Sequence, residues 1–411
     1  MAMDLSRRAF ALGSLGLLGA ACSSSSGPTH SAPASRLVQV RSGTARRVAL
    51  GSLTASELAD AQRAFGVDLL GKVCTTGENT TISPASAALA LGLLTAGARG
   101  GTEKKISAML HLPPWGDDVV AAYAAQHALL TGFSDQLQIA NRPYVAVGNT
   151  PAKQTLDDWA TGFDADLTQL DLANHPKEST DRINADVSKD TAGLIPTLFA
   201  KPLDADTVVV LVNALHLKAD WLEPFLEDRT DDALFTTDTG TSVRVRMMQG
   251  AFGTLRSVDG WQSVTLPYQR NHLEMVAILP PKGAGCDGLT PARLTALSRG
   301  ASDAAGELAM PKLDVSQTHD LLDVLASLGL PVRGDYGGIG ADTITGVIQK
   351  DVLKVDEKGT EAAAATGITA IATGARFAPT RLVLDRPYFL LLQDVQTGTP
   401  LFLSHVVDPT A

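Results

Sequence analysis

The residues that could perform catalysis are scattered along this chain of 411 residues. It contains no Gly-x-Ser-x-Gly turn, no Ser-x-x-Lys pair and no Cys-x-x-Cys pair, which are local signatures of nucleophilic and redox sites. The closest two of its eight histidines, His111 and His127, are sixteen residues apart, so no helical pair of metal ligands occurs. A Ser–His–Asp triad assembled from distant residues is defined by geometry and is left open. We therefore expect no enzyme, no cofactor and no metal ion.

One segment has an unusual composition. Glu357-Lys358-Gly359-Thr360-Glu361 is followed by the alanines from Ala362 to Ala365 and by a run without charge or proline that continues to Ala375. Propensity alone predicts a helix, because Glu-Ala-Ala-Ala-Ala is a good helix former. The small, uncharged side chains would also allow the segment to join a β-sheet as a strand.

The remaining motifs decide between these interpretations. Short patterns follow one another in this order: Ser83-Pro84-Ala85-Ser86, Ile183-Asn184, Thr191 to Ile195, Val210 to Ala214, Trp221, Leu266-Pro267-Tyr268, Ile278-Leu279-Pro280, Met310-Pro311-Lys312, Arg386 to Phe389 and Asp394 to Phe402. Each is weak alone, but their order over residues 55–411 resembles the serpin family. The resemblance implies an α+β serpin-like fold: a large mixed sheet, further β-sheets, a set of helices and an exposed reactive loop at residues 357–379.

Local patterns agree with an α+β architecture. Thr54 and Glu57 form a capping-box pattern that predicts a helix from residue 55. The apolar, β-branched run from Thr207 to Leu217 is typical of a strand buried on both faces. Tyr388 to Leu392 and Leu401 to Val407 predict two late strands. No linker interrupts residues 55–411, so we expect one large domain and a monomer.

In serpins the exposed loop is bait for a protease. The protease cuts the loop, and the segment before the cut inserts into the main sheet as an additional strand. The protease is at that moment an acyl-enzyme, esterified to the residue before the cut, and is carried across the molecule before water can release it. The resemblance therefore implies an irreversible suicide-substrate inhibitor of serine proteases, with cysteine proteases as further candidate targets.

The hinge of this loop favours inhibition. The residues that match the family hinge are Glu357, Gly359, Thr360, Ala362, Ala363, Ala364 and Ala365. Non-inhibitory serpins commonly carry a charged, bulky or proline residue among these positions. In this chain the matching residues Thr360 and Ala362 to Ala365 all have small side chains. The alternative is a non-inhibitory serpin-fold binding protein or chaperone on the cell surface, and an adhesin is also left open. We expect Thr360 to lie at the exposed rim of the uncut loop.

The scissile bond is predicted between Thr373 and Gly374. Inhibitory serpins are cut about seventeen residues into the segment that begins at the hinge glutamate. Cleavage after Ala372 or Arg376 is left open, although Arg376 would lengthen the inserting arm beyond the family norm. Thr373 suits a protease with a small apolar primary pocket, such as an elastase-like or subtilisin-like enzyme.

The resemblance also assigns a polar shutter beneath the middle of the main sheet. Ser83, Ser86 and Asn213 match the residues whose hydrogen bonds hold the central strands closed in the family. Gln349 stands where the family commonly has a histidine. Because glutamine donates and accepts but does not titrate, pH-sensitive opening through this position is not expected.

The region where the loop enters the sheet, the breach, is matched by Trp221, Lys312 and Glu357. Core packing is the alternative explanation for Trp221. Lys312 and Glu357 could equally be a surface ion pair that contributes little stability.

The first residues predict an export signal at 1–21. Arg7 and Arg8 precede an apolar run that is too short to span a bilayer, a pattern typical of twin-arginine signals. Leu18 to Cys22 resembles a bacterial lipobox with Gly19 where leucine is usual, so we expect lipidation of Cys22; an ordinary signal peptide is the alternative. Residues 22–54 should form a disordered, serine-rich tether. The protein would then be an exported cell-envelope lipoprotein, periplasmic, at the cell surface or extracellular.

Charge and cysteine content limit the partners. The net charge of −10 argues against nucleic-acid binding and against electrostatic attachment to a membrane, so membrane attachment would depend on the lipid. Cys74 and Cys286 could pair in an oxidising compartment. We expect them instead to be separate, small apolar residues.

Overall fold

Helix α1 (Ala55–Val73) begins where the capping box predicts it. The Thr54 hydroxyl accepts a hydrogen bond from the Glu57 amide at 3.1 Å, and the Glu57 carboxylate accepts one from the Thr54 amide at 2.7 Å. The other α-helices in the described part of the chain are α2 (Pro84–Gly97), α3 (Gly100–Met109), α4 (Asp117–Thr131), α5 (Lys153–Gly162), α6 (Pro176–Asp190), α7 (Pro291–Arg299) and α8 (Leu322–Leu328).

The structure is a computed structural model that describes residues 38–49, 51–191, 193, 195–360 and 380–411. The chain from Leu37 onward forms one unit. Within the described ranges, no helix combines the length and the apolar character needed to cross a membrane.

The main sheet is mixed. Its strands run in the order β1 (Val38–Arg41), β4 (Leu167–Leu170), β3 (Leu137–Ala146), β5 (Val209–Leu217), β15 (Gly346–Val355), β16 (Gly359–Thr360) and β6 (Ala219–Asp220), with β12 (Leu313–Asp320) paired to β15. The central strands β5 and β15 are parallel, whereas β3 is antiparallel to β5 and β12 is antiparallel to β15.

A second sheet contains the late strands that the sequence predicts. Its order is β17 (Thr380–Val383), β11 (Ala304–Pro311), β8 (Ser242–Val258), β9 (Trp261–Pro267), β10 (Leu273–Leu279), β18 (Tyr388–Asp394), β19 (Pro400–Val406) and β2 (Thr80–Ile82), with β7 (Asp231–Thr236) paired to β8. A hairpin of β13 (Arg333–Tyr336) and β14 (Ala341–Thr343) forms a small third sheet. The α+β fold with a large mixed sheet is therefore confirmed.

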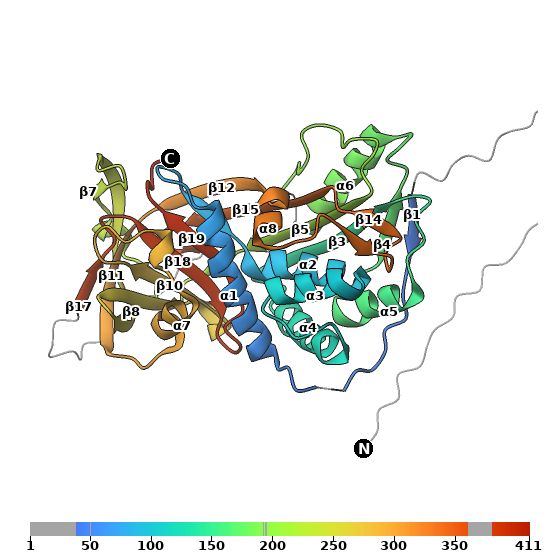
Figure 1. The fold of residues 1–411 in the computed structure, drawn as a ribbon. Coiled ribbons are helices and arrows are strands. Elements are labelled where there is room, and N and C mark those ends of the chain that lie inside the picture. Colours follow the sequence, from blue (N-terminus) through green and yellow to red (C-terminus); the bar gives the residue numbers. More distant parts are fainter. Residues whose placement is uncertain (1–37, 50, 192, 194, 361–379) are drawn as a thin grey trace, which may run out of the picture. The chain divides into compact units, whose positions relative to one another are not determined.

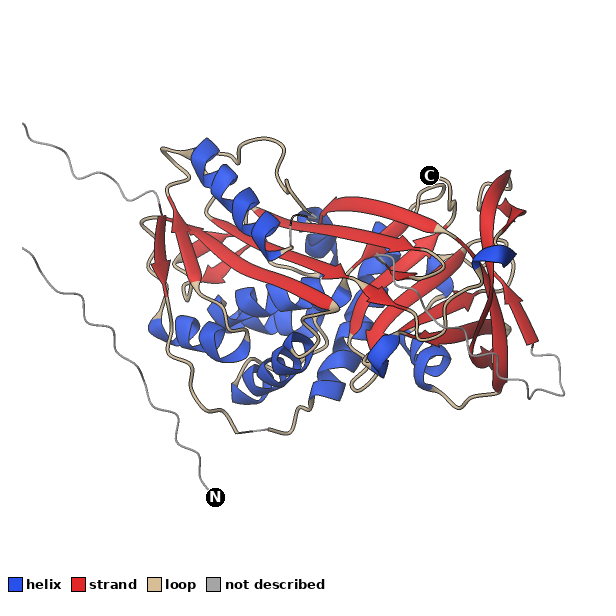
Figure 2. Ribbon diagram, turned by 180° about the vertical axis from the view of Figure 1, so that it is seen from behind, coloured by secondary structure: helices blue, strands red, loops and turns tan. Residues whose placement is uncertain are grey.

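Helices cover both faces of the main sheet (Figures 1 and 2). α6 packs over one face, where Ile183 and Val187 join Val210 and Val212 of β5. α2 lies against β3 and β5 on the other face. β5 is consequently buried on both sides, as its apolar run predicts.

Two apolar cores meet beneath the main sheet. The first half of β5, with Val209 and Leu211, belongs to the core around α2. The second half, with Leu215 and Leu217, belongs to the core of the second sheet. β15 divides in the same way, with Val347 in the first core and Leu353 and Val355 in the second. The polar residues of β15 that face inward therefore lie between two apolar clusters.

Strand β1 corrects the predicted tether. Val38 to Arg41 pairs with β4 in an antiparallel register from Val38–Leu170 to Arg41–Leu167. The following residues contact α5 and α4: the Thr44 amide donates to Asp157, and the Arg46 guanidinium lies 2.8 Å from both Asp158 and Asp117. The expectation of a disordered tether through residue 54 is wrong for this stretch, because the open edge of β4 offers backbone partners to a segment with alternating valines.

The two cysteines of the folded part form a disulfide. Cys74 follows α1, and Cys286 follows β10; their Cα atoms are 6.5 Å apart although 212 residues separate them in the sequence. The expectation that they are separate apolar residues is wrong. Their proximity depends on how α1 packs beside the second sheet, which composition does not reveal.

Candidate functional site

The main sheet is closed in its middle, and beyond this closed part it contains Gly359 and Thr360, the first residues of the predicted reactive loop that the structure describes. β5 and β15 pair from Val210–Gly346 to Leu215–Asp351. Beyond that point the short strand β16 lies between β15 and β6, with Thr360 opposite Val355 on one side and Ala219 on the other. The first residues of the predicted hinge are thus already part of the sheet.

Thr360 is fully buried rather than exposed at the loop rim, so the expectation for this residue is wrong. Its hydroxyl lies 2.6 Å from the hydroxyl of Tyr268. Gly359 packs so closely that a Cβ atom there would collide with the Ala219 carbonyl. A large side chain at Thr360 would consequently disturb the uncut fold as well as any later insertion.

The three residues assigned to the breach, Trp221, Lys312 and Glu357, lie around the turn that leads into β16. Trp221 donates from its backbone amide to the Lys358 carbonyl at 2.8 Å and from its indole nitrogen to the Asp356 carbonyl at 3.0 Å. Its ring stacks on Tyr268, with centroids 4.3 Å apart. Trp221 therefore holds the backbone that leads into the hinge in addition to filling the core.

Glu357 anchors the same turn through both carboxylate oxygens. One oxygen is 2.7 Å from the Lys312 ammonium, and the other accepts a hydrogen bond from the Thr230 hydroxyl at 2.7 Å. Burial alone would raise the pKa of Glu357, but the hydrogen bonds from Lys312 and Thr230 outweigh it and lower that pKa. The Glu357 side chain is 10% exposed, so this pair is more than a surface ion pair.

The shutter is built on Gln349. Its side-chain oxygen accepts from the Ser83 amide at 3.1 Å, and its side-chain nitrogen donates to the Ser83 carbonyl at 2.9 Å. The Ser83 hydroxyl accepts from the Ser86 amide and caps α2, and Asn213 is the register partner of Gln349 on β5. Gln349 and Asn213 therefore lie opposite each other in the sheet, and the neutral Gln349 side chain joins β15 to Ser83 at the start of α2.

A histidine that the motif comparison overlooked lies one strand away. His319 on β12 is the register partner of Gln349 and bonds the Thr81 carbonyl through Nε2 at 2.8 Å. Burial lowers the pKa of His319, and the contact with Thr81 opposes this effect. In the sequence, His319 is marked only by its place in the alternating segment that follows Met310-Pro311-Lys312.

Asp351 is a second overlooked residue. It faces inward two positions after Gln349, is 1% exposed, and neither carboxylate oxygen has a hydrogen-bond partner among the described residues. Burial raises the pKa of Asp351 well above its usual value. Asp351 and Leu215 form the last register pair between β15 and β5, next to the place where β16 lies between β15 and β6.

Other predicted site residues lie outside the described part of the chain. These are the bond residues Thr373 and Gly374, the alternatives Ala372 and Arg376, the hinge alanines Ala362 to Ala365 and the lipidation site Cys22.

A large mixed sheet with helices on both faces, next to a second large sheet, is the architecture of the serpin class of protein. A family model described as serpin (serine protease inhibitor) matches residues 60–409, and the chain belongs to this family.

Particular relatives share most of the chain. It is 32% identical over 368 residues to alpha-1-antiproteinase F of Cavia porcellus, covering 82% of this chain and 88% of that protein. It is 30% identical over 380 residues to the leukocyte elastase inhibitor of Bos taurus, covering 86% of this chain and all (100%) of that protein. The structure of tengpin, a thermophilic serpin in its native state, aligns with a TM-score of 0.76 at 25% identity over 89% of this chain and 97% of that one.

Proposed function

We propose that this protein is an irreversible suicide-substrate inhibitor of serine proteases. The observation that carries the proposal is β16: Gly359 and Thr360 already lie between β15 and β6, directly above the point where β5 and β15 close. If the chain continued beyond Thr360 as a strand in the same direction, it would enter between β5 and β15. The hinge alanines that follow present no bulky or charged side chain to resist burial.

The strand directions support insertion energetically. β5 and β15 are parallel to each other, and β16 is antiparallel to β15. A continuing strand would therefore replace one parallel pair by two antiparallel pairs, which are slightly more stable per residue. Opening requires the separation of β5 from β15 and the loss of contacts at the shutter, and this provides a kinetic barrier.

Insertion would immobilise the protease through a covalent bond. The protease serine oxygen attacks the Thr373 carbonyl carbon, the amide bond to Gly374 breaks, and the Gly374 nitrogen leaves as an amine that has taken up a proton. The ester then joins the protease to the inserting arm. At about 3.3 Å per residue, the thirteen residue steps from Thr360 to Thr373 span about 43 Å, enough to carry the protease along the sheet.

The proposed targets have a small apolar primary pocket, as elastase-like or subtilisin-like serine proteases do. Thr373 preceded by Ile371-Ala372 is the basis for this assignment, and a relative that is named an elastase inhibitor supports it. Cysteine proteases, which also form acyl-enzymes, are a further candidate class.

The test is to mix the full chain with a panel of serine proteases. We expect a protease complex that survives boiling in detergent, and the mass of the released carboxyl-terminal peptide should place the cut after Thr373. Ala364→Arg should abolish the complex while the loop is still cut, because Ala364 shares the buried face of Thr360 at period two. Ala378→Arg, on the other side of the bond, is the matched control and should still trap protease.

The outcomes separate the alternatives. If each protease cuts the chain and departs active, the inhibitor is refuted and the non-inhibitory binding protein or chaperone takes its place. If Ala364→Arg traps protease as well as the parent protein does, strand insertion is not the mechanism.

We also propose that residues 1–21 direct export and that Cys22 carries a lipid, so that a tether from Cys22 to residue 37 joins the folded part to the cell envelope. Cys22→Ser should then move the exported protein from the membrane fraction to the soluble fraction. An unchanged distribution would leave an ordinary signal peptide.

A further inference from the structure

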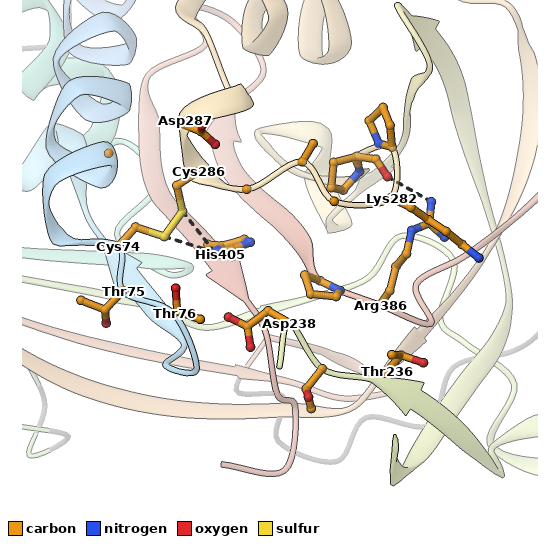
Figure 3. A pocket seen from close by; sticks show the side chains of 18 of the residues that line it. Cys74, Thr75, Thr76, Thr236, Asp238, Lys282, Cys286, Asp287, Arg386 and His405 are labelled. Carbon is orange, nitrogen blue, oxygen red and sulfur yellow. Dashed lines mark hydrogen bonds between the residues drawn. A yellow bond between two sulfur atoms is a disulfide. The ribbon is translucent and has the colours of Figure 1, made fainter. Parts of the chain in front are cut away.

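The disulfide lies beside a histidine at the wall of a pocket (Figure 3). Cys74 comes from the end of α1, Cys286 from the segment after β10, and His405 from β19. The pocket has a volume of about 660 Å³ and is also lined by Asp238 and Arg386. Three segments that are far apart in the sequence therefore place two sulfur atoms and an imidazole at one site.

His405 points one ring nitrogen at both sulfur atoms. Nδ1 lies 3.2 Å from the Cys74 sulfur and 3.1 Å from the Cys286 sulfur, and the three potential ligand atoms are within 4.8 Å of one another. The ring stacks on Phe389 with centroids 4.5 Å apart, which fixes its orientation. Nε2 is buried and has no hydrogen-bond partner within the described ranges, so Nδ1 makes the polar contacts of this ring.

We propose that, when the disulfide is reduced, Cys74, Cys286 and His405 Nδ1 bind one zinc-type divalent ion whose fourth position faces the pocket. Two thiolates and an imidazole are a ligand set that zinc uses, and a set of three protein ligands leaves one position for water or a small anion. The site is independent of the inhibitory function proposed above.

The ligand atoms need little rearrangement. With Zn–S bonds of about 2.3 Å and Zn–N bonds of about 2.0 Å, tetrahedral geometry places each sulfur about 3.5 Å from the nitrogen and the two sulfurs about 3.8 Å apart. The sulfur–nitrogen distances of 3.1 and 3.2 Å are already close to this value. The main change is separation of the sulfurs, which the Cα distance of 6.5 Å can accommodate by side-chain rotation.

Reduction of the disulfide and binding of the metal ion are two separate steps, each balanced in electrons and protons. A thiol reductant gives two electrons and two protons to the Cys74–Cys286 bond, leaving two protein thiols and the disulfide of the reductant. The ion then binds both sulfurs as thiolates and releases two protons to solvent.

The ion would replace the covalent link as a clamp. In the oxidised protein the disulfide joins the end of α1 to the segment after β10. In the reduced protein the metal would join the same two segments and add β19 through His405. The connection between these elements would then persist in reducing surroundings as long as zinc is present.

The test uses the full chain with Cys22→Ser, so that no other cysteine contributes thiolate. The protein is reduced, freed of reductant without oxygen and titrated with Co²⁺, and zinc affinity is measured by competition with a coloured chelator. We expect one ion per chain and a thiolate-to-cobalt charge-transfer band. The oxidised protein should show neither.

His405→Gln should weaken binding at least about tenfold, while His111→Ala, which removes an exposed histidine elsewhere, should leave it unchanged. Cys74→Ser should remove most of the charge-transfer band and provides a second variant if His405→Gln does not fold. The proposal is overturned if the reduced protein shows no thiolate band, or if folded His405→Gln binds as tightly as its parent.

Discussion

At the scale of single residues, Asp351 is the group whose environment conflicts most with its chemistry. A carboxylate that is buried without a partner strongly disfavours its charged form, and burial raises the pKa of Asp351 well above its usual value. The folded protein therefore holds this proton at pH values where the unfolded chain has lost it. Stability should fall as pH rises from about 4, the ordinary pKa of aspartate, toward the raised pKa.

Asp351→Asn removes this titration while nearly preserving shape. We expect the variant to be more stable than the parent protein by more than about 1 kcal/mol near pH 7, with the difference disappearing near pH 4. Thermal unfolding midpoints measured between pH 4 and 8 check this. Asp314→Asn, which changes an exposed residue paired with Lys354, is the control and should show no such trend. Parallel pH profiles for Asp351→Asn and its parent would contradict the assignment.

The contact between Thr360 and Tyr268 allows a double-mutant test of hinge seating. Thr360→Val or Tyr268→Phe leaves one buried hydroxyl without the partner it has at 2.6 Å, so each should reduce the free energy of unfolding by about 1–3 kcal/mol. The double variant removes both hydroxyls and should lose less than the sum of the two. Urea unfolding measures the cycle. Simple additivity would show that the hydroxyl pair is not formed in solution.

The family resemblance assigns residues to a shutter and a breach, but it does not give the contacts that define their environment. Ser83, Trp221 and Glu357 each lie in a short pattern, whereas Gln349 is assigned only because it stands where the family commonly has a histidine. Tyr268 was part of such a pattern too, yet its bond to Thr360 joins residues 92 positions apart and depends on how β16 is seated. Burial of Thr360 follows from the packing of three strands, so local sequence could not predict it.

At the scale of elements, β1 is the most testable addition to the sheet. Gln39→Pro combined with Val40→Pro removes the backbone donors of two consecutive residues, one of which must face β4, and should detach this edge strand from β4. Hydrogen exchange should then accelerate in Leu167–Leu170, while β5 and β15 retain their protection. Two prolines placed at Ser24 and Ser26 are the matched control. Unchanged protection of β4 would show that β1 does not pair there in solution.

Predictability differs between elements for physical reasons. α1 and β5 were predictable because a capping box and a continuous apolar run specify them locally. β1 was missed because its two valines lie in a polar region whose composition favours a tether. β16 could not be chosen over a helix from propensity, since its strand form exists only between β15 and β6.

At the scale of the whole molecule, the proposed insertion predicts that cutting the loop stabilises the fold. A metalloprotease that cuts within residues 361–379 makes no acyl-enzyme, so the cut protein is left free. We expect its thermal midpoint to rise well above that of the uncut protein, because the inserted strand gains backbone hydrogen bonds on both edges. Ala364→Arg cut in the same way should not show the rise. Equal midpoints for cut and uncut parent protein would argue against insertion.

The bond between Cys74 and Cys286 has a topological consequence for this movement. It closes a covalent ring of chain that contains β5 and α6, whereas β15, the hinge and β12 lie outside the ring. The boundary between β5 and β15 therefore also separates the part of the chain inside the disulfide-closed ring from the part outside it. In the proposed insertion, a strand arriving from the hinge would pass alongside the ring without threading it, so the crosslink would tie α1 to the second sheet without obstructing the opening of the main sheet.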